Sequence, residues 1–183
     1  SLPQGPVGVI DLGGGSTEIV IGEGPTIVSA RSLEIGTVRL TEQVCTTAPD
    51  RFTPTHREEL WALAHAEAER LEWPVRPQAL VGVAGTATTL AASDLGLLHW
   101  DAQAVHGSSL TRSSLQRWTE RLIGPDLRAR EEMVPTSPER ANTVLAGACI
   151  LLAICQVAEV DELQISVGGI RHGLVSSKDV NKA

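Results

Sequence analysis

The residues with the clearest chemical potential lie together at 11–18, which reads DLGGGSTE and combines three glycines, two hydroxyls and two carboxylates. Apolar runs at 7–10 and 19–21 flank this segment, and both have the length and β-branched residues of short strands. Consecutive glycines let backbone N–H groups approach an anion closely, because no Cβ stands in the way. Asp11 and Glu18 can then hold a hard divalent cation against that anion. The segment therefore predicts a loop that binds phosphate and a metal.

Two better-known glycine loops do not fit this context. The dinucleotide fingerprint and the Walker A loop both need a helix directly after the glycines, whereas a strand is expected here. Ser16 lacks the glycine two residues later that a nucleophile elbow requires, so we do not expect it to be a nucleophile. The alternative is an ordinary glycine-rich hairpin whose polar side chains only cap the turn.

A second candidate anion site follows an apolar run at 79–84, where 85–92 reads GTATTLAA and indicates the opening of a helix. Gly85 and Thr86 would lie where the unpaired first-turn N–H groups and the positive end of the helix dipole favour an anion. The hydroxyls of Thr86 and Thr88 can add donors. The alternative is a normal strand-to-helix turn in which Thr86 caps its own helix.

A third glycine-containing junction occupies 168–175 and reads GGIRHGLV. Arg171, beside two glycines at a strand end, can reach a phosphate through both guanidinium nitrogens. A structural salt bridge is an equally good interpretation of Arg171. His172 has no assigned role.

The remaining patterns predict a mixed sheet with an antiparallel meander at one side and parallel strands covered by helices. A third strand is expected at 26–33 and a last one at 163–167. The apolar residues from 139 to 157 recur at helical spacing and predict the main buried helix. A segment that turns into a helix is expected at 36–42. Further helices are expected at 55–71 with Thr55 near its cap and at 110–122 with Thr111 or Ser113 as cap, and a short helix or turn is expected at 126–133.

Composition bounds the class of protein. A chain of 183 residues with 42% hydrophobic and 20% charged residues predicts one globular domain. No apolar stretch reaches the ~20 residues of a membrane span, and the first residues do not resemble a secretion signal. Cys45, Cys149 and Cys155 have no metal-ligand spacing, so we expect buried free thiols and a cytoplasmic protein.

The formal net charge of −7 argues against nucleic acid held by a basic surface. A polyanionic substrate is still compatible with this charge. It would be held by backbone N–H groups, a divalent metal and a few arginines.

Taken together, these motifs resemble the second half of the catalytic unit of the exopolyphosphatase / guanosine-pentaphosphate phosphohydrolase family. The resemblance spans nearly the whole chain in the family's order. It rests on VIDLGGGSTE at 9–18, SLEIGTVRLTE at 32–42, GTATTLA at 85–91, PERA at 138–141 and GGIRHGL at 168–174.

The resemblance implies a ribonuclease-H-like α/β domain of the actin, sugar-kinase and heat-shock chaperone superfamily. It implies that Asp11 and Glu18 bind Mg²⁺ and order the attacking water, as the catalytic and metal-binding residues. Phosphate would be bound by Gly13, Gly14, Gly15 and Ser16 on one side, and by Gly85, Thr86 and Arg171 on the other. The substrate would be inorganic polyphosphate or guanosine pentaphosphate.

By the same resemblance, residues 1–183 form a single domain, the second of a two-domain phosphatase unit. The family's first domain, with its own phosphate loop and the glutamate assigned as catalytic base, would precede Val7 and is absent from this chain. We expect the fragment alone to be inactive and the full-length protein to be a homodimer. Two alternatives are a catalytically silent module that binds these polyphosphates, and the nucleotide-binding domain of a kinase in the same superfamily.

Overall fold

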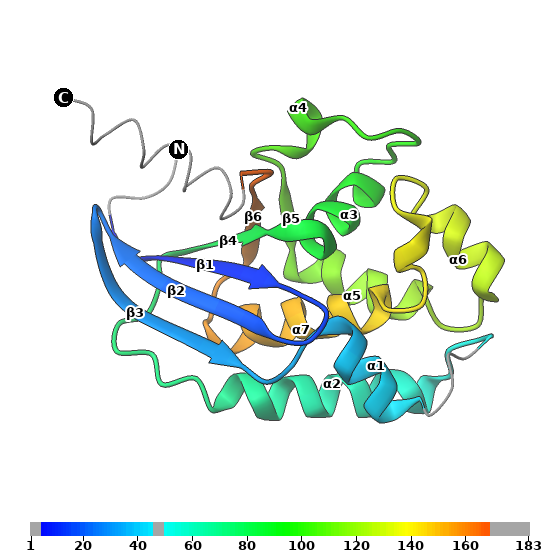
Figure 1. Ribbon diagram of the computed structural model, residues 1–183, viewed down its shortest axis with the longest axis horizontal. Helices are drawn as coiled ribbons and strands as arrows, with labels where there is room; N and C mark the ends of the chain where they lie inside the picture. The colour runs from blue at the N-terminus through cyan, green and yellow to red at the C-terminus, as the bar shows by residue number, and fades with distance from the viewer. Residues whose placement is uncertain (1–4, 46–49, 169–183) are drawn as a thin grey trace.

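A six-stranded mixed sheet forms the centre of the protein, in the strand order β3-β2-β1-β4-β6-β5 (Figure 1). The computed structural model describes residues 5–45 and 50–168. Within that part, β1, β2 and β3 form an antiparallel meander, β4 and β6 extend it in parallel with β1, and β5 closes the far edge in antiparallel fashion. The strands are β1 (Val7–Leu12), β2 (Thr17–Glu23), β3 (Thr26–Leu33), β4 (Ala79–Val83), β5 (Ser109–Thr111) and β6 (Glu162–Ile165).

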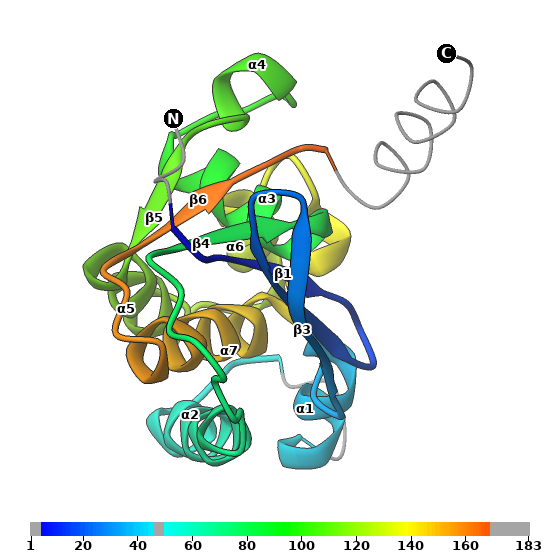
Figure 2. The ribbon, with the colours of Figure 1, turned by 90° about the vertical axis from the view of Figure 1, so that its left-hand side faces the viewer.

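One helix, α7 (Val144–Val157), is the centre of the core, because all but its last two residues are buried. Figure 2 shows α7 between the sheet and α2. This all-round apolar character is what a helix covered on every side requires. The other helical segments are α1 (Thr37–Val44), α2 (Pro54–Glu69), α3 (Ala84–Asp94), α4 (Ala102–Val105), α5 (Arg112–Arg121), α6 (Leu127–Met133) and the 3₁₀ turn η1 (Pro138–Arg140).

The two faces of the sheet differ in burial. Along β1 and β2, four side chains are buried: Ile10, Leu12, Ile19 and Ile21. The first three belong to the same apolar cluster as the residues of α7. Their neighbours in the sequence point to the opposite face, because strand side chains alternate. Asp11 and Glu18 lie in that second, less buried set.

The mixed sheet with an antiparallel meander is confirmed, whereas several boundaries were wrong. The helix expected at 55–71 spans Pro54–Glu69, and the side chain that caps it is Thr53, two residues before Thr55. The Thr53 hydroxyl accepts from His56 N at 3.2 Å. Pro54 occupies the first helical position, where no N–H is needed for an intrahelical bond. The main buried helix begins at Val144 rather than at residue 139. Pro138 instead opens a separate 3₁₀ turn that ends at Arg140.

Two short elements were not foreseen, namely β5 and α4. Leu110 was expected to open a helix, but it lies in β5, and the helix begins only at Arg112 with Thr111 as its cap. A strand of three residues is too short to show alternation in the sequence. Its conformation comes from pairing with β6.

The three cysteines are free and buried as expected. Burial raises the pKa of both Cys149 and Cys155 to about 12, so these thiols stay protonated and serve as packing groups. Among the described residues, no helix combines the length and the apolar character that crossing a bilayer demands.

Candidate functional site

The two glycine junctions lie side by side at one edge of the sheet. Strands β1 and β4 are parallel neighbours, with Asp11 opposite Val83. The turn that begins at Gly13 and the junction that contains Gly85 therefore follow adjacent strand ends, at the right-hand end of the sheet in Figure 1. The strand register thus brings the two candidate anion sites together.

The Gly13–Ser16 turn is open on its outer side. The N–H of Gly13 donates to the carbonyl of Ser16 at 3.0 Å and closes the turn. Gly14 and Gly15 are exposed, and a Cβ placed on Gly15 would meet nothing within 4 Å. In residues 5–45 and 50–168, the N–H groups of Gly14 and Gly15 donate to no backbone carbonyl, so they are available to an anion.

The inner side of the same turn is fixed by α1. The carbonyl of Gly13 accepts from Thr37 N at 3.0 Å, and that of Gly14 accepts from Val38 N at 2.9 Å. These bonds use N–H groups that would otherwise be unpaired at the start of a helix. At Gly36 a Cβ would collide with the backbone of Gly14 and Gly15. The glycine before α1 is thus needed for the close approach of the loop.

The two carboxylates are cross-strand neighbours, since Asp11 on β1 stands opposite Glu18 on β2. Glu18 Oε1 accepts hydrogen bonds from Ser16 Oγ at 2.7 Å and from Ser32 Oγ at 3.0 Å. Burial, and then the charge of Glu18, raise the pKa of Asp11 above its ordinary value. Like charges held this close repel each other unless a cation lies between them.

The donor set suits magnesium better than zinc. Within the described part of the chain, no group of three or more His, Cys, Asp or Glu side chains converges, as a closed zinc site would require. Magnesium is commonly held by one or two carboxylates, waters and the phosphate of its substrate. Asp11 and Glu18, beside a turn with exposed N–H groups, fit that description.

The Gly85 junction differs from an ordinary capped turn. Ala84 has φ of +67°, which is costly for a residue with a Cβ. The helix α3 then begins without a side-chain cap, so Thr86 does not cap its own helix. Thr86 is 4% exposed and its methyl group packs against Gly147 of α7. From the residues that the structure describes, the first-turn N–H groups of α3 receive no side-chain acceptor, so they can face an anion.

The expectation that Thr88 adds a free donor was wrong. Its hydroxyl bonds the carbonyls of Ala84 at 3.0 Å and Gly85 at 3.2 Å. A hydroxyl has one proton, and in Thr88 that proton is engaged within the first turn of α3. This arrangement is common for threonine inside a helix.

An arginine that sequence reasoning left without a role lies at this junction. The atoms nearest to a Cβ built on Gly85 belong to the guanidinium of Arg140. Its side chain is 38% exposed, and in the described part of the chain its one carboxylate neighbour within 4 Å is Glu139, at 3.8 Å. Arg140 therefore places positive charge beside the start of α3. The sequence signal was the PERA motif, which was identified without assigning a function to its arginine.

The segment that carries Arg140 is held by a second, fully buried arginine. Arg130 Nε donates to the carbonyl of Ala141 at 3.1 Å, and Arg130 Nη1 donates to the carbonyls of Asp50 and Pro125. Its guanidinium also stacks over the ring of Phe52, 4.5 Å from the centroid. Arg130 thus ties together three chain segments and fixes the residue next to Arg140. Arg171 and His172 lie outside the described residues, so their predicted placement stays a prediction.

The match to a family model covers residues 1–181, and that model describes the Ppx/GppA phosphatase family. The chain belongs to the Ppx/GppA phosphatase family. It is 36% identical over 182 residues to "Exopolyphosphatase 2" of Mycobacterium tuberculosis, covering 94% of this chain and 55% of that relative. It is 29% identical over 174 residues to "Guanosine-5'-triphosphate,3'-diphosphate pyrophosphatase" of Vibrio parahaemolyticus, covering 91% of this chain and 32% of that one.

Solved structures of the Ppx/GppA family share the fold described above. The crystal structure of the Aquifex aeolicus family member matches with a TM-score of 0.89 and 33% identity, over 98% of this chain and 58% of that one. An exopolyphosphatase from Cytophaga hutchinsonii matches with a TM-score of 0.81 at 20% identity, which shows the fold alone. These matches confirm the predicted fold class. The chain spans about half the length of the first curated relatives that it matches.

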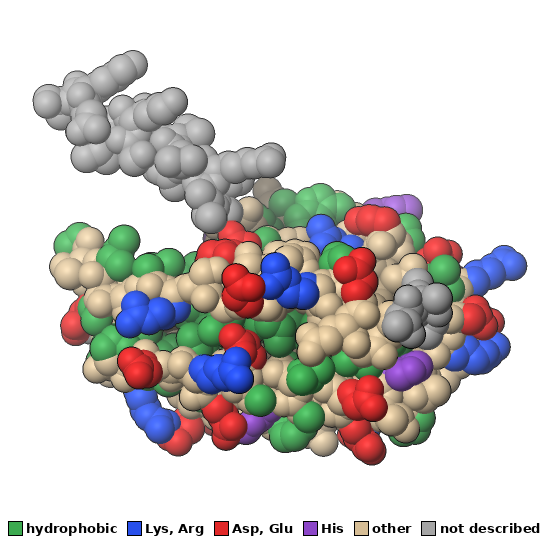
Figure 3. All heavy atoms as spheres, turned by 60° about the horizontal axis from the view of Figure 1, so that its bottom comes forward, with side chains coloured by type: hydrophobic (Ala, Val, Ile, Leu, Met, Phe, Trp, Pro, Cys, Tyr) green, Lys and Arg blue, Asp and Glu red, His purple; other side chains and the backbone are tan. Residues whose placement is uncertain are grey.

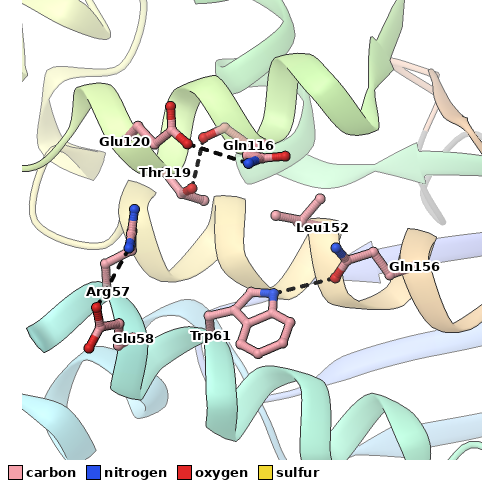
Figure 4. Close-up of a pocket in the computed structure, with 8 residues that line it drawn as sticks. All are labelled: Arg57, Glu58, Trp61, Gln116, Thr119, Glu120, Leu152 and Gln156. Carbon is pink, nitrogen blue, oxygen red and sulfur yellow. Dashed lines mark hydrogen bonds and ion pairs between the residues drawn. The ribbon is translucent and has the colours of Figure 1, made fainter. Parts of the chain in front are cut away.

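A separate groove of about 280 Å³ lies in the helical layer of this family domain, between α2 and α5 over the end of α7 (Figure 4). Trp61 forms one wall and donates its indole N–H to Gln156 Oε1 at 3.3 Å. Acidic and basic side chains are interspersed on the surface around α2 (Figure 3). The groove has no glycine turn and no start of a helix, so it lacks the features that make the sheet edge suitable for phosphate. It is lined by Arg57, Glu58, Trp61, Gln116, Thr119, Glu120, Leu152 and Gln156.

Proposed function

We propose that this chain forms the metal- and phosphate-binding wall of a phosphohydrolase. The full protein would release terminal phosphate from inorganic polyphosphate, or the 5′ γ-phosphate from guanosine pentaphosphate, with Mg²⁺. One observation carries the proposal: the Asp11–Glu18 pair, the open Gly13–Ser16 turn and the uncapped start of α3 share one edge of the sheet. The relatives named as exopolyphosphatase and guanosine-pentaphosphate phosphatase support the choice of substrates.

Groups from both junctions would contact the phosphate. The N–H groups of Gly14 and Gly15 would donate to phosphate oxygens from one side. The first turn of α3 and the Arg140 guanidinium would approach from the other side, because Arg140 lies against Gly85. An arginine can bind two phosphate oxygens at once and holds a planar orientation. The phosphate would thus be gripped between two adjacent strand ends.

Asp11 and Glu18 would hold the cation. When bound there, Mg²⁺ would neutralise the negative charge of the phosphate oxygens and the charge that develops on the leaving oxygen. Ser16 and Ser32 fix the carboxylate of Glu18, so this side chain is held in place before the ligand arrives. A carboxylate held in this way would keep the cation in place, and the positive charge of the cation would stabilise a phosphoryl-transfer transition state without rearrangement of the site.

The opposite wall of the cleft, and the general base that activates water, would come from another domain of the full protein. The chain's share of about half of its relatives' length supports such a domain, and the family resemblance is the ground for placing the general base on it. A phosphate bound on one open wall stays in contact with water, where electrostatic stabilisation is weak. General-base assistance contributes roughly 10²–10⁴-fold. We therefore expect this chain alone to bind phosphate weakly and to hydrolyse it slowly.

The decisive experiment measures phosphate release by the full-length protein from polyphosphate and from guanosine pentaphosphate, with and without Mg²⁺. The proposal expects Mg²⁺-dependent release of inorganic phosphate from at least one of them. Binding of both substrates without turnover would favour a silent binding module. Transfer of phosphate from ATP to an acceptor would favour a kinase.

A further inference from the structure

The carboxylate of Glu18 is held by two serine hydroxyls on the same oxygen. Ser16 Oγ lies 2.7 Å from Glu18 Oε1, and Ser32 Oγ lies 3.0 Å from that atom. Glu18 Oε2 accepts no hydrogen bond from any residue that the structure describes. Two donors on one oxygen fix the rotamer of the side chain and leave the second oxygen open to another partner.

The two serines belong to different parts of the chain. Ser16 is in the exposed turn, beside the N–H groups of Gly14 and Gly15. Ser32 is on β3, directly opposite Glu18 in the strand register, while Asp11 stands opposite Glu18 on the other side. Asp11, Glu18 and Ser32 therefore form one row across three strands, in which cross-strand neighbours are about 5 Å apart.

A phosphate bound in the turn would compete for the proton of Ser16. A serine hydroxyl has a single proton to donate, so Ser16 can serve either Glu18 or a phosphate oxygen. Ser32 lies outside the turn and has no such competition. Without Ser32, binding of phosphate would leave the Glu18 carboxylate with neither serine hydrogen bond. Electrostatic repulsion from Asp11 would then move the carboxylate of Glu18 away from Asp11.

We propose that Ser32 is a positioning residue, which keeps the Glu18 carboxylate next to Asp11 when a bound phosphate takes the hydroxyl of Ser16. This inference rests on the proposed function, because it takes Asp11 and Glu18 as the cation ligands. It adds a residue on β3 to the site, and it assigns Ser16 to Glu18 in the free protein and to phosphate in the complex.

The test measures binding of Mn²⁺ to the full-length protein by electron paramagnetic resonance, in which the free ion gives the signal. The titration is run with and without saturating inorganic phosphate. With phosphate, Ser32→Ala should weaken Mn²⁺ binding by about tenfold, as losses of hydrogen bonds to metal ligands do. Without phosphate, Ser16 still holds Glu18, and the loss should be about twofold or less. The double variant Ser16→Ala with Ser32→Ala should show about the tenfold loss even without phosphate.

Two further variants separate positioning from general damage to β3. Ser32→Thr keeps the hydroxyl and should bind Mn²⁺ like the natural protein. Ser29→Ala is a matched control, because Ser29 lies on the same strand, opposite Ile21, on the other face of the sheet. Its side chain makes no hydrogen bond within the described residues, so this variant should also leave Mn²⁺ binding unchanged.

The outcomes distinguish this inference from the proposed function. Equal losses for Ser32→Ala with and without phosphate would overturn the inference, as would a Ser32→Thr variant as weak as Ser32→Ala. Asp11→Asn provides the test of the cation site itself. If Asp11→Asn abolishes Mn²⁺ binding and Ser32→Ala has no effect, the inference alone fails. If Asp11→Asn leaves Mn²⁺ binding unchanged, both fail.

Discussion

The two glycine junctions look alike in the sequence but use their small residues differently. In the Gly13–Ser16 turn, Gly15 has open space where a Cβ would stand. At the Gly85 junction, a Cβ would collide with the Arg140 guanidinium, and Thr86 packs tightly against Gly147. The first junction is open to solvent, whereas the second is partly buried, with the partly exposed side chain of Arg140 against Gly85 and the packed Gly147 against Thr86. The same residue type thus indicates access in one place and close packing in the other.

This difference separates effects on activity from effects on stability. Substitutions on the open side of the Gly13–Ser16 turn remove few contacts, so they should change binding or turnover and leave the fold intact. Substitutions in the enclosed part of the site force packed atoms apart, so they should lower the free energy of unfolding first.

The largest expected effect comes from Glu18→Gln in the full-length protein. The amide keeps an oxygen that can accept from Ser16 and Ser32 but loses the charge that faces the cation. We expect turnover of polyphosphate or guanosine pentaphosphate to fall by about 10²-fold or more, as for loss of a preorganised charge, with a melting temperature no lower than that of the natural protein. Glu23→Gln, at the exposed end of the same strand, is the control. Full turnover in Glu18→Gln would remove Glu18 from the mechanism.

Gly36 and Gly15 form a matched pair on the two sides of the open turn. Gly36→Ala places a methyl group against the backbone of Gly14 and Gly15, so it should destabilise the fold by about 2 kcal/mol. Gly15→Ala meets no neighbour and should change stability by less than about 0.5 kcal/mol, while weakening binding of inorganic phosphate. Urea unfolding and phosphate titration measure the two effects. A stable Gly36→Ala would show that α1 does not fix the turn.

The enclosed junction can be tested by repacking Thr86 against α7. Gly147→Ala should cost about 1–3 kcal/mol, because its methyl group would overlap that of Thr86. Thr86→Ser removes the methyl group that clashes, so the double variant should recover about 1 kcal/mol relative to the sum of the two single changes. Denaturant unfolding of all four proteins gives this coupling. Additive effects would mean that α3 and α7 move apart enough to accommodate the methyl group of Gly147→Ala, so that Thr86 and Gly147 are not tightly packed.

The smallest expected effect is a pH-dependent gain of stability in Asp11→Asn. The pKa of Asp11 is raised by burial and by Glu18, so the folded protein holds this proton more tightly than the unfolded chain. The ionised carboxylate therefore destabilises the fold as the pH rises through the folded pKa. Without divalent cations, Asp11→Asn should melt at a higher temperature than the natural protein at pH about 7. The gain should vanish below the ordinary carboxyl pKa of 3.8, and an equal gain at both pH values would contradict this account.

Much of this protein was determined by local sequence. The glycine turn between β1 and β2, the meander that follows and the strand before Gly85 could be predicted, because alternation and turn residues act over a few positions. The Asp11–Glu18 pairing also follows locally, since a short turn sets the register of a hairpin. The family's motifs in order were sufficient to predict the fold class, which the matches to solved structures confirm.

Only the tertiary structure decided which distant side chains lie beside the two glycine junctions. Ser32 lies opposite Glu18 because the register of β2 and β3 shifts between Ile21 and Gly22, which turn length alone does not predict. Arg140 lies against Gly85 on a segment that Arg130 holds from across the fold. The sequence spacing of these residues has no period that would reveal such contacts. The short strand β5 was missed for the same reason, as it depends on pairing with β6. Contacts between residues far apart in the sequence depend on how helices and strands pack against each other, and local propensity does not predict that packing.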